Sequence, residues 1–383
     1  RVVRGETRVF RRARGFVPEA IALGFDAPPL LAVGADLKNT LCLAEGGSAI
    51  LSQHIGDMEN PETQTFFFET RDRLQKLFGV RPLFVAHDLH PGYHTTLLAA
   101  RIGLPSIPVQ HHHAHIASCL IDNGRRDRVI GVAWDGTGYG PDGTVWGGEF
   151  LVADLEGFHR VGRIRPVSMP GGDAAIRAPW RMALSHALAA GVAWPKSVEY
   201  RGSATVSTML RNNVQCVPTS SAGRLFDAVA ALLGLRAEDA YEGQAAMELE
   251  SMAIECDEPY PWSQIESDGI IDVDMRPLVR AVLEDAGAGV APSRIAGRFH
   301  STLAAMIAGT CRRIRDQVGL STVALSGGCF QNRLLTESTA SGLTSEGFEV
   351  LLHRRVPCGD GGIALGQAAV AGWRFKNVSG NSR

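Results

Sequence analysis

The sequence predicts an α/β fold built from two lobes, because the same order of elements occurs twice along the chain. Residues 23–127 and residues 128–383 each read as three strands followed by helix, strand, helix, strand and helix. Helices and strands that alternate in this way form sheets covered by helices. A largely helical insertion, at about residues 165–292, interrupts the second unit, and 383 residues are enough for two lobes.

The first unit opens with short apolar segments separated by turn residues. Between Leu30 and Asp57 the runs LLAVG, TLCLA and SAILSQ are separated by a polar turn and a Glu-Gly-Gly turn, which predicts a three-stranded meander. A helix follows from the N-cap Asn60 to the stop at Gly79, with its apolar residues on one stripe. We expect the next strand, helix, strand and helix at residues 81–88, 94–103, 106–110 and 111–124.

The second unit repeats this order. Strands at residues 128–157 surround an Asp-Gly-Thr-Gly turn, and after the insertion we expect helix, strand, helix, strand and helix at residues 293–318, 322–326, 332–343, 348–353 and from 362 onward. In this element order the chain resembles the actin, sugar-kinase and Hsp70 (ASKHA) superfamily, whose fold is also described as RNase H-like. That resemblance implies a cleft between the lobes, where ligands of open α/β sheets usually bind.

The composition argues against several classes of protein. A formal net charge of −2 provides no general attraction for nucleic acid or an anionic membrane, so we expect neither as a partner. No run of about 18 apolar residues occurs, and the start lacks the apolar core of a signal peptide, which predicts a cytoplasmic protein. The seven cysteines are scattered without a C-x-x-C pair, so neither a disulfide framework nor a thiolate zinc site is expected.

Four of the twelve histidines lie within residues 111–115, in the stretch PSIPVQHHHAHIASCLIDNG. On a helix, residues four apart share a face, so His111 and His115 can bind one metal ion together, while His112 and His113 point elsewhere. A helix whose imidazoles bond to carbonyl groups explains the pattern equally well. A third ligand is needed to decide between these interpretations.

Two aspartates are candidates for that third ligand. Asp360 lies on the glycine-rich turn VPCGDGGIALGQA between the last strand and the last helix, and Asp135 lies at the end of a strand in WDGTGYG. Imidazoles together with carboxylates suit iron or zinc and leave open positions for a ligand oxygen. The alternative for Asp135 is contact with a phosphate or with magnesium.

Ten motifs occur in the order and spacing of one known family. They are GADLKNT, LSQHIGDMENPET, AHDLHPGY, VQHHHAHIAS, DGTGYGPDGTVWGGEF, PGGDAA, TSSAGRLFDAVAALLG, YEGQAAMELE, LSGGCFQNRLL and VPCGDGGIALGQA. Together they resemble the C-terminal domain of the HypF family, the carbamoyltransferases of nickel–iron hydrogenase maturation. That domain is in turn similar to TsaD-type threonylcarbamoyltransferases and antibiotic O-carbamoyltransferases. The likeness runs from about residue 10 to residue 374.

The resemblance assigns roles to particular residues. It implies one transition-metal ion, iron or zinc, as a catalytic group on His111, His115, Asp135 and Asp360. It also implies nucleotide contacts, in which glycines let backbone N–H groups approach a phosphate and an aspartate suits ribose hydroxyls. These contacts fall on Asp135, Gly136, Thr137, Gly138, Tyr139, Asp227, Gly243, Gly327, Gly328 and Asn332.

Structural interpretations compete with several of these nucleotide assignments. Gly327 and Gly328 also fit a strand-to-helix turn, Asp227 a carboxylate on a helix surface, and Asn332 a helix cap. Lys38 either neutralises a phosphate or is a solvated turn lysine. The chain departs from the family pattern at Gly92, where HPDY is usual, and at Gly359, where NDGG is usual.

The activity that the resemblance implies is carbamoyl transfer from carbamoyl-adenylate to the C-terminal cysteine thiol of a HypE-like acceptor protein, with AMP as leaving group. The product would become the cyanide ligand of the hydrogenase iron. Residues 1–22 look like a linker that follows an upstream YrdC-like domain, which makes carbamoyl-adenylate from carbamoyl phosphate and ATP, with magnesium as a further expected ion. The start at Arg1 agrees with a piece of a longer polypeptide.

Two other functions fit the same fold. A small-molecule O-carbamoyltransferase would have the same metal site and a hydroxyl acceptor, whereas a nucleotide-gated scaffold of the Hsp70 type would need no transition metal. A covalent route through Cys358 or Cys329 is a further alternative, since both lie in the expected site loops, although position beside a motif is weak evidence of an activated thiol.

Overall fold

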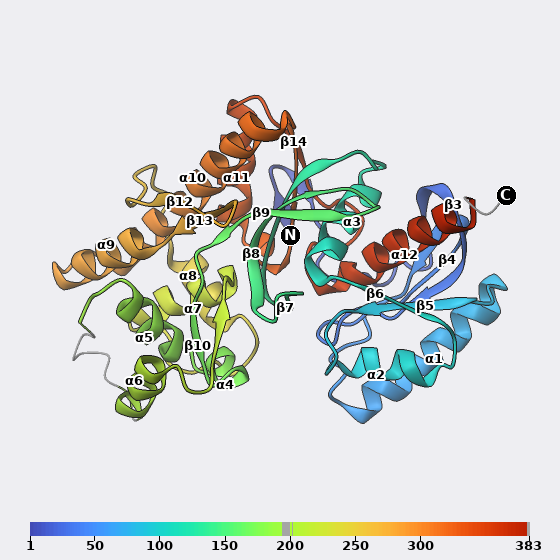
Figure 1. The fold of residues 1–383 in the computed structure, drawn as a ribbon, viewed down its shortest axis with the longest axis horizontal. Coiled ribbons are helices and arrows are strands. Elements are labelled where there is room, and N and C mark those ends of the chain that lie inside the picture. Colours follow the sequence, from blue (N-terminus) through green and yellow to red (C-terminus); the bar gives the residue numbers. More distant parts are fainter. Residues whose placement is uncertain (194–199, 201, 381–383) are drawn as a thin grey trace.

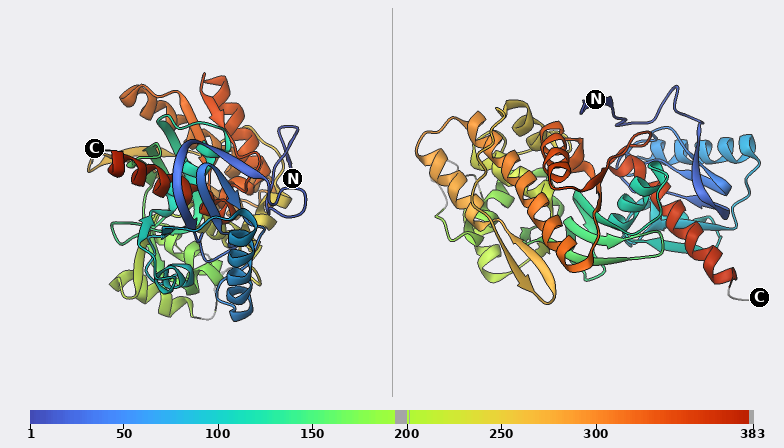
Figure 2. Two further views of the ribbon diagram at one scale, coloured as in Figure 1. Left: turned by 90° about the vertical axis from the view of Figure 1, so that its right-hand side faces the viewer. Right: turned by 90° about the horizontal axis from the view of Figure 1, so that it is seen from above.

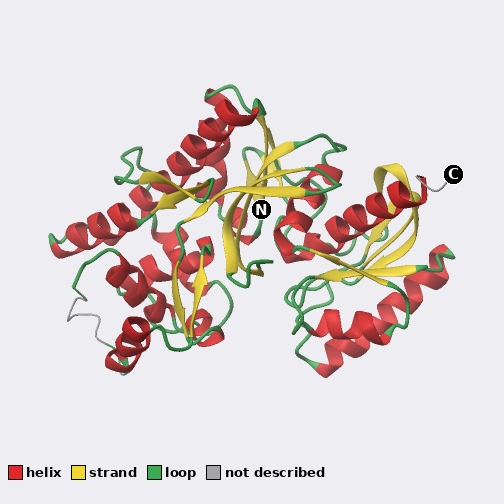
Figure 3. Ribbon diagram, viewed as in Figure 1, coloured by secondary structure: helices red, strands yellow, loops and turns green. Residues whose placement is uncertain are grey.

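The computed structural model describes residues 1–193, 200 and 202–380 of the chain. Two sheets lie side by side, a four-stranded one and a nine-stranded one, with helices on their faces (Figures 1 and 3). This arrangement confirms the predicted two-lobed α/β class. Among the described residues, no helix is long and apolar enough to cross a membrane.

The four-stranded sheet has the order β4-β3-β5-β6. Alternate residues of its strands enter different apolar clusters: Leu30 and Ala32 lie in one, and Leu31 and Val33 in the other. The sheet is therefore covered on both faces. Its elements are β3 (Ala20–Ala32), β4 (Cys42–Leu51), α1 (Pro61–Phe78), β5 (Phe84–Asp88), α2 (His94–Arg101) and β6 (Ser106–Val109).

The predicted three-stranded meander of the first unit is wrong, because the structure has two strands there. Strand β3 begins at Ala20, ten residues before the predicted start at Leu30, and β4 continues through the Glu-Gly-Gly segment that was expected to be a turn. The pairing shifts between Ala22↔Ser48 and Leu30↔Ala44, so the two strands bend at a bulge without losing contact. The extra residues of these shifts lie on β3, whereas β4 passes evenly through the Glu-Gly-Gly segment.

The nine-stranded sheet places β7 (Val129–Tyr139) between β8 (Val145–Ala153) and β14 (Thr322–Ser326). Strands β7, β8 and β9 (Phe158–Ile164) form an antiparallel meander, and β14 pairs with β7 in parallel. The predicted turn at Asp-Gly-Thr-Gly is wrong, because β7 continues through these residues with a local shift in its pairing, and the third strand lies beyond the predicted range of 128–157. The other elements of this unit lie at the predicted places. They are α10 (Pro292–Val318), η2 (Gly328–Gln331), α11 (Arg333–Ser345), β15 (Glu349–Leu351), η3 (Asp360–Gly362) and α12 (Ile363–Gly380). The last helix of the first unit, α3 (His111–Asp122), also lies where it was predicted.

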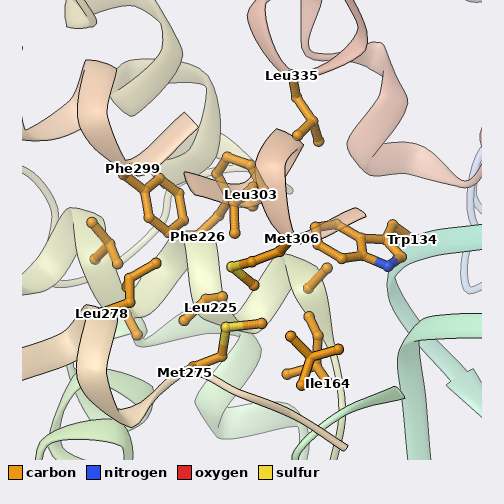
Figure 4. Close-up of a cluster of buried hydrophobic side chains, with 14 of the residues drawn as sticks. Trp134, Ile164, Leu225, Phe226, Met275, Leu278, Phe299, Leu303, Met306 and Leu335 are labelled. Carbon is orange, nitrogen blue, oxygen red and sulfur yellow. The ribbon is translucent and has the colours of Figure 1, made fainter. Parts of the chain in front are cut away.

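The insertion is largely helical, and it also contributes strands to the sheet. Strand β13 pairs in parallel with β9 and so extends the sheet at its edge. The buried side chains of Phe226, Phe299 and Met306 pack together between insertion and sheet (Figure 4). The elements between β9 and α10 are β10 (Val167–Pro170), α4 (Asp173–Arg177), α5 (Pro179–Ala189), α6 (Ser203–Asn212), β11 (Cys216–Thr219), α7 (Ala222–Leu232), α8 (Gln244–Met252), β12 (Ser263–Ser267), β13 (Ile270–Asp274) and α9 (Arg276–Gly287).

Two helices join the sheets. Helix α12 is the last element of the second unit in sequence, yet its residues belong to the same apolar cluster as Leu30 and Ala32 of the first sheet (Figure 2). It crosses α3 closely at Gly366, where an added Cβ atom would lie 1.8 Å from the carbonyl oxygen of Ala114. The predicted lobe boundary after residue 127 falls between α3 and β7.

The crossing of α3 and α12 predicts the effect of one methyl group. We expect Gly366→Ala to lower the free energy of unfolding by about 3 kcal/mol, because the new Cβ must push apart two backbones. Urea denaturation followed by circular dichroism would measure the change. The matched control is Gly287→Ala, whose Cβ would meet nothing within 4 Å and should leave stability unchanged or slightly raised. Equal losses in the two variants would contradict the packing described here.

Candidate metal and nucleotide site

Three segments bring the candidate metal ligands together. Helix α3 starts at His111 directly after β6, and the side chain of Gln110 caps it by accepting a hydrogen bond from the N–H of His113. Asp135 lies where the pairing of β7 with β8 becomes irregular, after Trp134↔Gly148. A bulge of this kind turns a side chain away from the regular pleat. Asp360 follows on the turn before α12.

The four predicted ligands converge on one small volume. The Nε2 atoms of His111 and His115 lie 3.2 and 3.1 Å from Oδ2 of Asp135. The same nitrogens lie 3.7 and 3.8 Å from Oδ1 of Asp360. One donor atom from each residue fits within a group whose members are all within 4.8 Å of one another. Such a set of nitrogen and oxygen atoms can hold a transition-metal ion.

Asp88 is a further residue of this site, and the sequence interpretation missed it. Its Oδ2 lies 2.7 Å from Nδ1 of His111, and both side chains are fully buried. This contact fixes the imidazole so that Nε2 faces the other ligands, as carboxylates commonly do for metal-binding histidines. The sequence held only part of the signal: Asp88 ends β5 in the motif AHDLHPGY, but the parallel pairing of β5 with β6, which leads to His111, is visible only in the structure.

The other two histidines of the stretch face away from this group, as predicted. Nε2 of His113 lies 2.6 Å from the carbonyl oxygen of Asp154, and Nδ1 of His112 lies 3.2 Å from the side-chain nitrogen of Gln110. Burial lowers the pKa of His113 to about 4 and that of His112 well below its ordinary value. Both rings are therefore neutral structural groups in a buried helix.

The charges of the group favour a bound cation. Burial raises the pKa of Asp360 to about 7, and the nearby charge of Asp135 adds to that rise. Burial also works to raise the pKa of Asp135, but hydrogen bonds from His111 and His115 hold it well below its ordinary value. Two carboxylates so close together repel each other unless a proton or a metal ion lies between them. The donor set therefore fits a metal ion.

Comparison with known proteins decides the family. Residues 131–367 match the family model described as "Carbamoyltransferase, Kae1-like Domain, second subdomain", and residues 25–122 match the one described as "HypF Kae1-like domain". The chain belongs to the HypF family. It is 42% identical to carbamoyltransferase HypF of Rhizobium leguminosarum bv. viciae, over 97% of this chain and 48% of that protein. It is also 39% identical to a carbamoyltransferase HypF homolog of Cupriavidus necator, over 92% of this chain and 94% of that protein.

Two solved HypF structures have the same fold. Full-length HypF in a phosphate- and nucleotide-bound form superimposes with a TM-score of 0.94 at 41% identity, over 98% of this chain and 60% of that one. HypF of T. kodakarensis gives a TM-score of 0.88 at 33% identity, over 98% of this chain and 51% of that one. The chain thus spans about half the length of the curated HypF proteins from Rhizobium leguminosarum and Rhodobacter capsulatus.

Lys38 lies close to the candidate metal ligands. Its Nζ forms an ion pair of 2.6 Å with Oε2 of Glu242, which links the loop after β3 to the segment before α8. Burial works to lower the pKa of Lys38, but the charges of Glu242, Asp360 and Asp135 raise it overall. The ammonium group is therefore charged and half-buried, and the interpretation as a freely solvated turn lysine is wrong.

Three of the predicted nucleotide residues have structural roles. The N–H of Gly328 donates a 2.8 Å hydrogen bond to Oδ1 of Asp135. Gly327 has φ +105°, and a Cβ there would lie 2.1 Å from the carbonyl oxygen of Trp134. Asn332 caps α11 by accepting from the N–H of Leu335. The interpretation as a strand-to-helix turn with a cap therefore accounts for these residues, and the turn also orients the carboxylate of the candidate ligand Asp135.

The remaining predicted nucleotide residues surround the same region. Asp227 is buried on α7 and pairs with Arg224 at 2.7 Å, so it is not the surface carboxylate of the competing interpretation. Gly138 packs against imidazoles of α3, whereas a Cβ at Gly136 would meet nothing within 4 Å. The ring of Tyr139 lies edge-on to that of His90, and Gly243 directly precedes α8. Thr137 follows Gly136 on β7.

The two cysteines near the site are poor nucleophiles. Burial raises the pKa of Cys358 to about 12 and that of Cys329 well above its ordinary value, and the charge of Asp135 adds to both shifts. A thiol reacts as its thiolate, which is scarce when the pKa is this high. The structure therefore gives no support to a covalent route through either thiol.

The metal group predicts a selective loss of metal. We expect His111→Ala and His115→Ala each to lower the affinity for Zn²⁺ by more than about 100-fold, because losing even the partner of a ligand costs about 10–100-fold. Elemental analysis after dialysis against a weak chelator would measure this. His113→Gln is the control, since its imidazole bonds to a carbonyl group outside the metal group. Full metal content in both alanine variants would place the site elsewhere.

Proposed function

We propose that this chain transfers the carbamoyl group of carbamoyl-adenylate to the C-terminal cysteine thiol of a HypE-like acceptor protein. The product thiocarboxamide would serve the synthesis of the cyanide ligands of nickel–iron hydrogenase. The observation that carries the proposal is the buried group of two histidines and two aspartates in a chain of the HypF family. The nucleotide-bound form of a HypF relative supports an adenylate as the donor.

The metal ion would be held by His111, His115, Asp135 and Asp360. Iron or zinc suits these donors, and when bound it would supply Lewis-acid polarisation of the carbamoyl oxygen. The protein prepares the ligands before any ion arrives. Asp88 orients His111 through Nδ1, and the N–H of Gly328 orients the Asp135 carboxylate. Each ligand therefore needs little rearrangement to bind.

The protein groups around the metal would position the two substrates. The end of β7 at Asp135–Tyr139, together with Asp227 and Gly243, would hold the adenosine and phosphate of the donor, and Lys38 would balance the charge of the phosphate. The acceptor sulfur then forms a bond to the carbamoyl carbon while the bond from that carbon to the phosphate oxygen breaks. The thiol proton is lost to solvent, and AMP leaves with the electron pair. Holding both reactants in place supplies much of the rate.

Synthesis of carbamoyl-adenylate is assigned to a separate YrdC-like domain. The HypF proteins of Rhizobium leguminosarum and Rhodobacter capsulatus are about twice as long as this chain, which supports a second active site outside these 383 residues. Magnesium and ATP would act in that first reaction. Transfer between domains would protect the labile intermediate from hydrolysis in bulk water.

The nucleotide assignment predicts the effect of a side chain at Gly136. A Cβ at this position enters open space, so Gly136→Val should leave the fold intact and weaken AMP binding by at least about 10-fold through loss of ligand volume. Isothermal titration calorimetry would measure the affinity. Gly328→Val is the poorer test, because its Cβ would meet the Asp135 carboxylate at 2.7 Å and disturb a metal ligand. Unchanged AMP affinity in Gly136→Val would contradict the assignment.

The assignment of adenylate synthesis and carbamoyl transfer to separate domains predicts which substrates this chain accepts. Supplied with carbamoyl-adenylate and a HypE-like acceptor, we expect it to carbamoylate the terminal cysteine, which mass spectrometry of the acceptor would detect. With carbamoyl phosphate and ATP it should be inert until a YrdC-like domain is added. The control reaction uses an acceptor whose terminal cysteine is replaced by serine.

Each other outcome of this assay points to a different function. Carbamoylated acceptor formed without the YrdC-like domain would show that the chain carries both half-reactions. Transfer to small-molecule hydroxyls and not to the thiol would favour an O-carbamoyltransferase. Nucleotide binding with neither transfer nor bound metal would favour the scaffold of the Hsp70 type.

A further inference from the structure

One of the four candidate ligands lies on a long irregular segment. Asp360 follows β15, which ends at Leu351, and no regular strand or helix occurs between residues 352 and 359. A free loop would have to lose conformational entropy each time a metal ion bound, which weakens binding. The position of Asp360 therefore depends on what fixes the segment of residues 353–358, here called the ligand loop.

Asp122 holds the first half of the ligand loop. Its carboxylate accepts hydrogen bonds from the backbone N–H groups of Arg354 at 2.5 Å and Arg355 at 3.1 Å, and lies 3.4 Å from that of Val356. The residue is only 4% exposed. Asp122 is the last residue of α3 and lies seven positions after His115, which places both on the same face of the helix.

Ser326 holds the second half. Its hydroxyl is fully buried and lies 3.2 Å from the carbonyl oxygen of Cys358, which also accepts from the N–H of Gly327 at 2.8 Å. Oγ of Ser326 also lies 2.8 Å from Nε2 of His353. The hydroxyl donates to the carbonyl, so the neutral imidazole donates to the hydroxyl oxygen. The serine thus joins both ends of the ligand loop to the end of β14.

We propose that Asp122 and Ser326 are positioning residues of the metal site. This proposal rests on the proposed function. By fixing the ligand loop they place Asp360 against the other three ligands before an ion binds. Helix α3 then serves the site twice: His111 and His115 at its start would bind the ion, and Asp122 at its end holds the segment that leads to Asp360. Neither Asp122 nor Ser326 touches the ion or the substrates.

The experiment uses Co²⁺ as the probe, because its visible absorption reports the number and arrangement of its ligands. For the parent chain, Ser326→Ala and Asp122→Asn, the dissociation constant would be measured by chelator competition at one pH, together with the spectrum. We expect affinity to fall by about 10–100-fold, the usual cost of losing a ligand's support. The spectrum should move toward that of Asp360→Ala. Thr339→Val is the control, since this buried hydroxyl makes no hydrogen bond among the described residues.

A double variant separates positioning from a general structural effect. If Ser326 acts through Asp360, then Ser326→Ala should weaken Co²⁺ binding in the parent and have no further effect in Asp360→Ala. Additive losses in the double variant, or a Ser326→Ala protein with parental affinity and spectrum, would overturn the proposal. Ser326→Ala decides the question even where Asp122→Asn fails to fold. Failure of the parent chain itself to bind Co²⁺ would instead remove the metal from the proposed function.

Discussion

The rest of the structure depends on the burial of helix α3 between the two sheets. All twelve residues of this helix are buried, and four of them in its first five positions are histidines. A buried imidazole is costly unless at least one of its nitrogen atoms has a hydrogen-bond partner. His111 meets Asp88 and Asp135, His115 meets Asp135, and His113 meets a backbone carbonyl. The need to satisfy these rings brings strand ends from both sheets to one place.

The sequence was informative where local spacing decides geometry. The i,i+4 spacing of His111 and His115 and the positions of Asp135 and Asp360 made these residues candidates, and the family resemblance joined them into one set, which the structure brings together. Asp88 was not predicted, because its role depends on β5 lying beside β6, a relation between segments that no local pattern contains. For the same reason Asp122 and Ser326 escaped notice, since their contacts join positions far apart in sequence.

The same contrast holds for the fold: features set by neighbouring residues were predicted, and features set by distant segments were not. Helix α1 has the predicted cap at Asn60 and the predicted end at Gly79, both of which follow from short-range chemistry. The hairpin of β3 and β4 differs from the prediction because cross-strand pairing carried β4 through residues that usually form a turn. Sequence likewise places α12 in the second unit, whereas its apolar residues pack on the first sheet. Packing partners therefore override both turn propensity and order along the chain.

Because α12 packs on the first sheet, a metal ion at this site would connect the two sheets. Asp360 lies on the short turn immediately before this helix, whereas Asp135 belongs to an inner strand of the other sheet. An ion bound by both carboxylates would connect the two lobes at the crossing of α3 and α12. A change in the angle between the lobes would then change the affinity for the ion, and binding of the ion would in turn change that angle. Moving the two sheets apart would weaken the binding of the ion, and removal of the ion would make that movement easier.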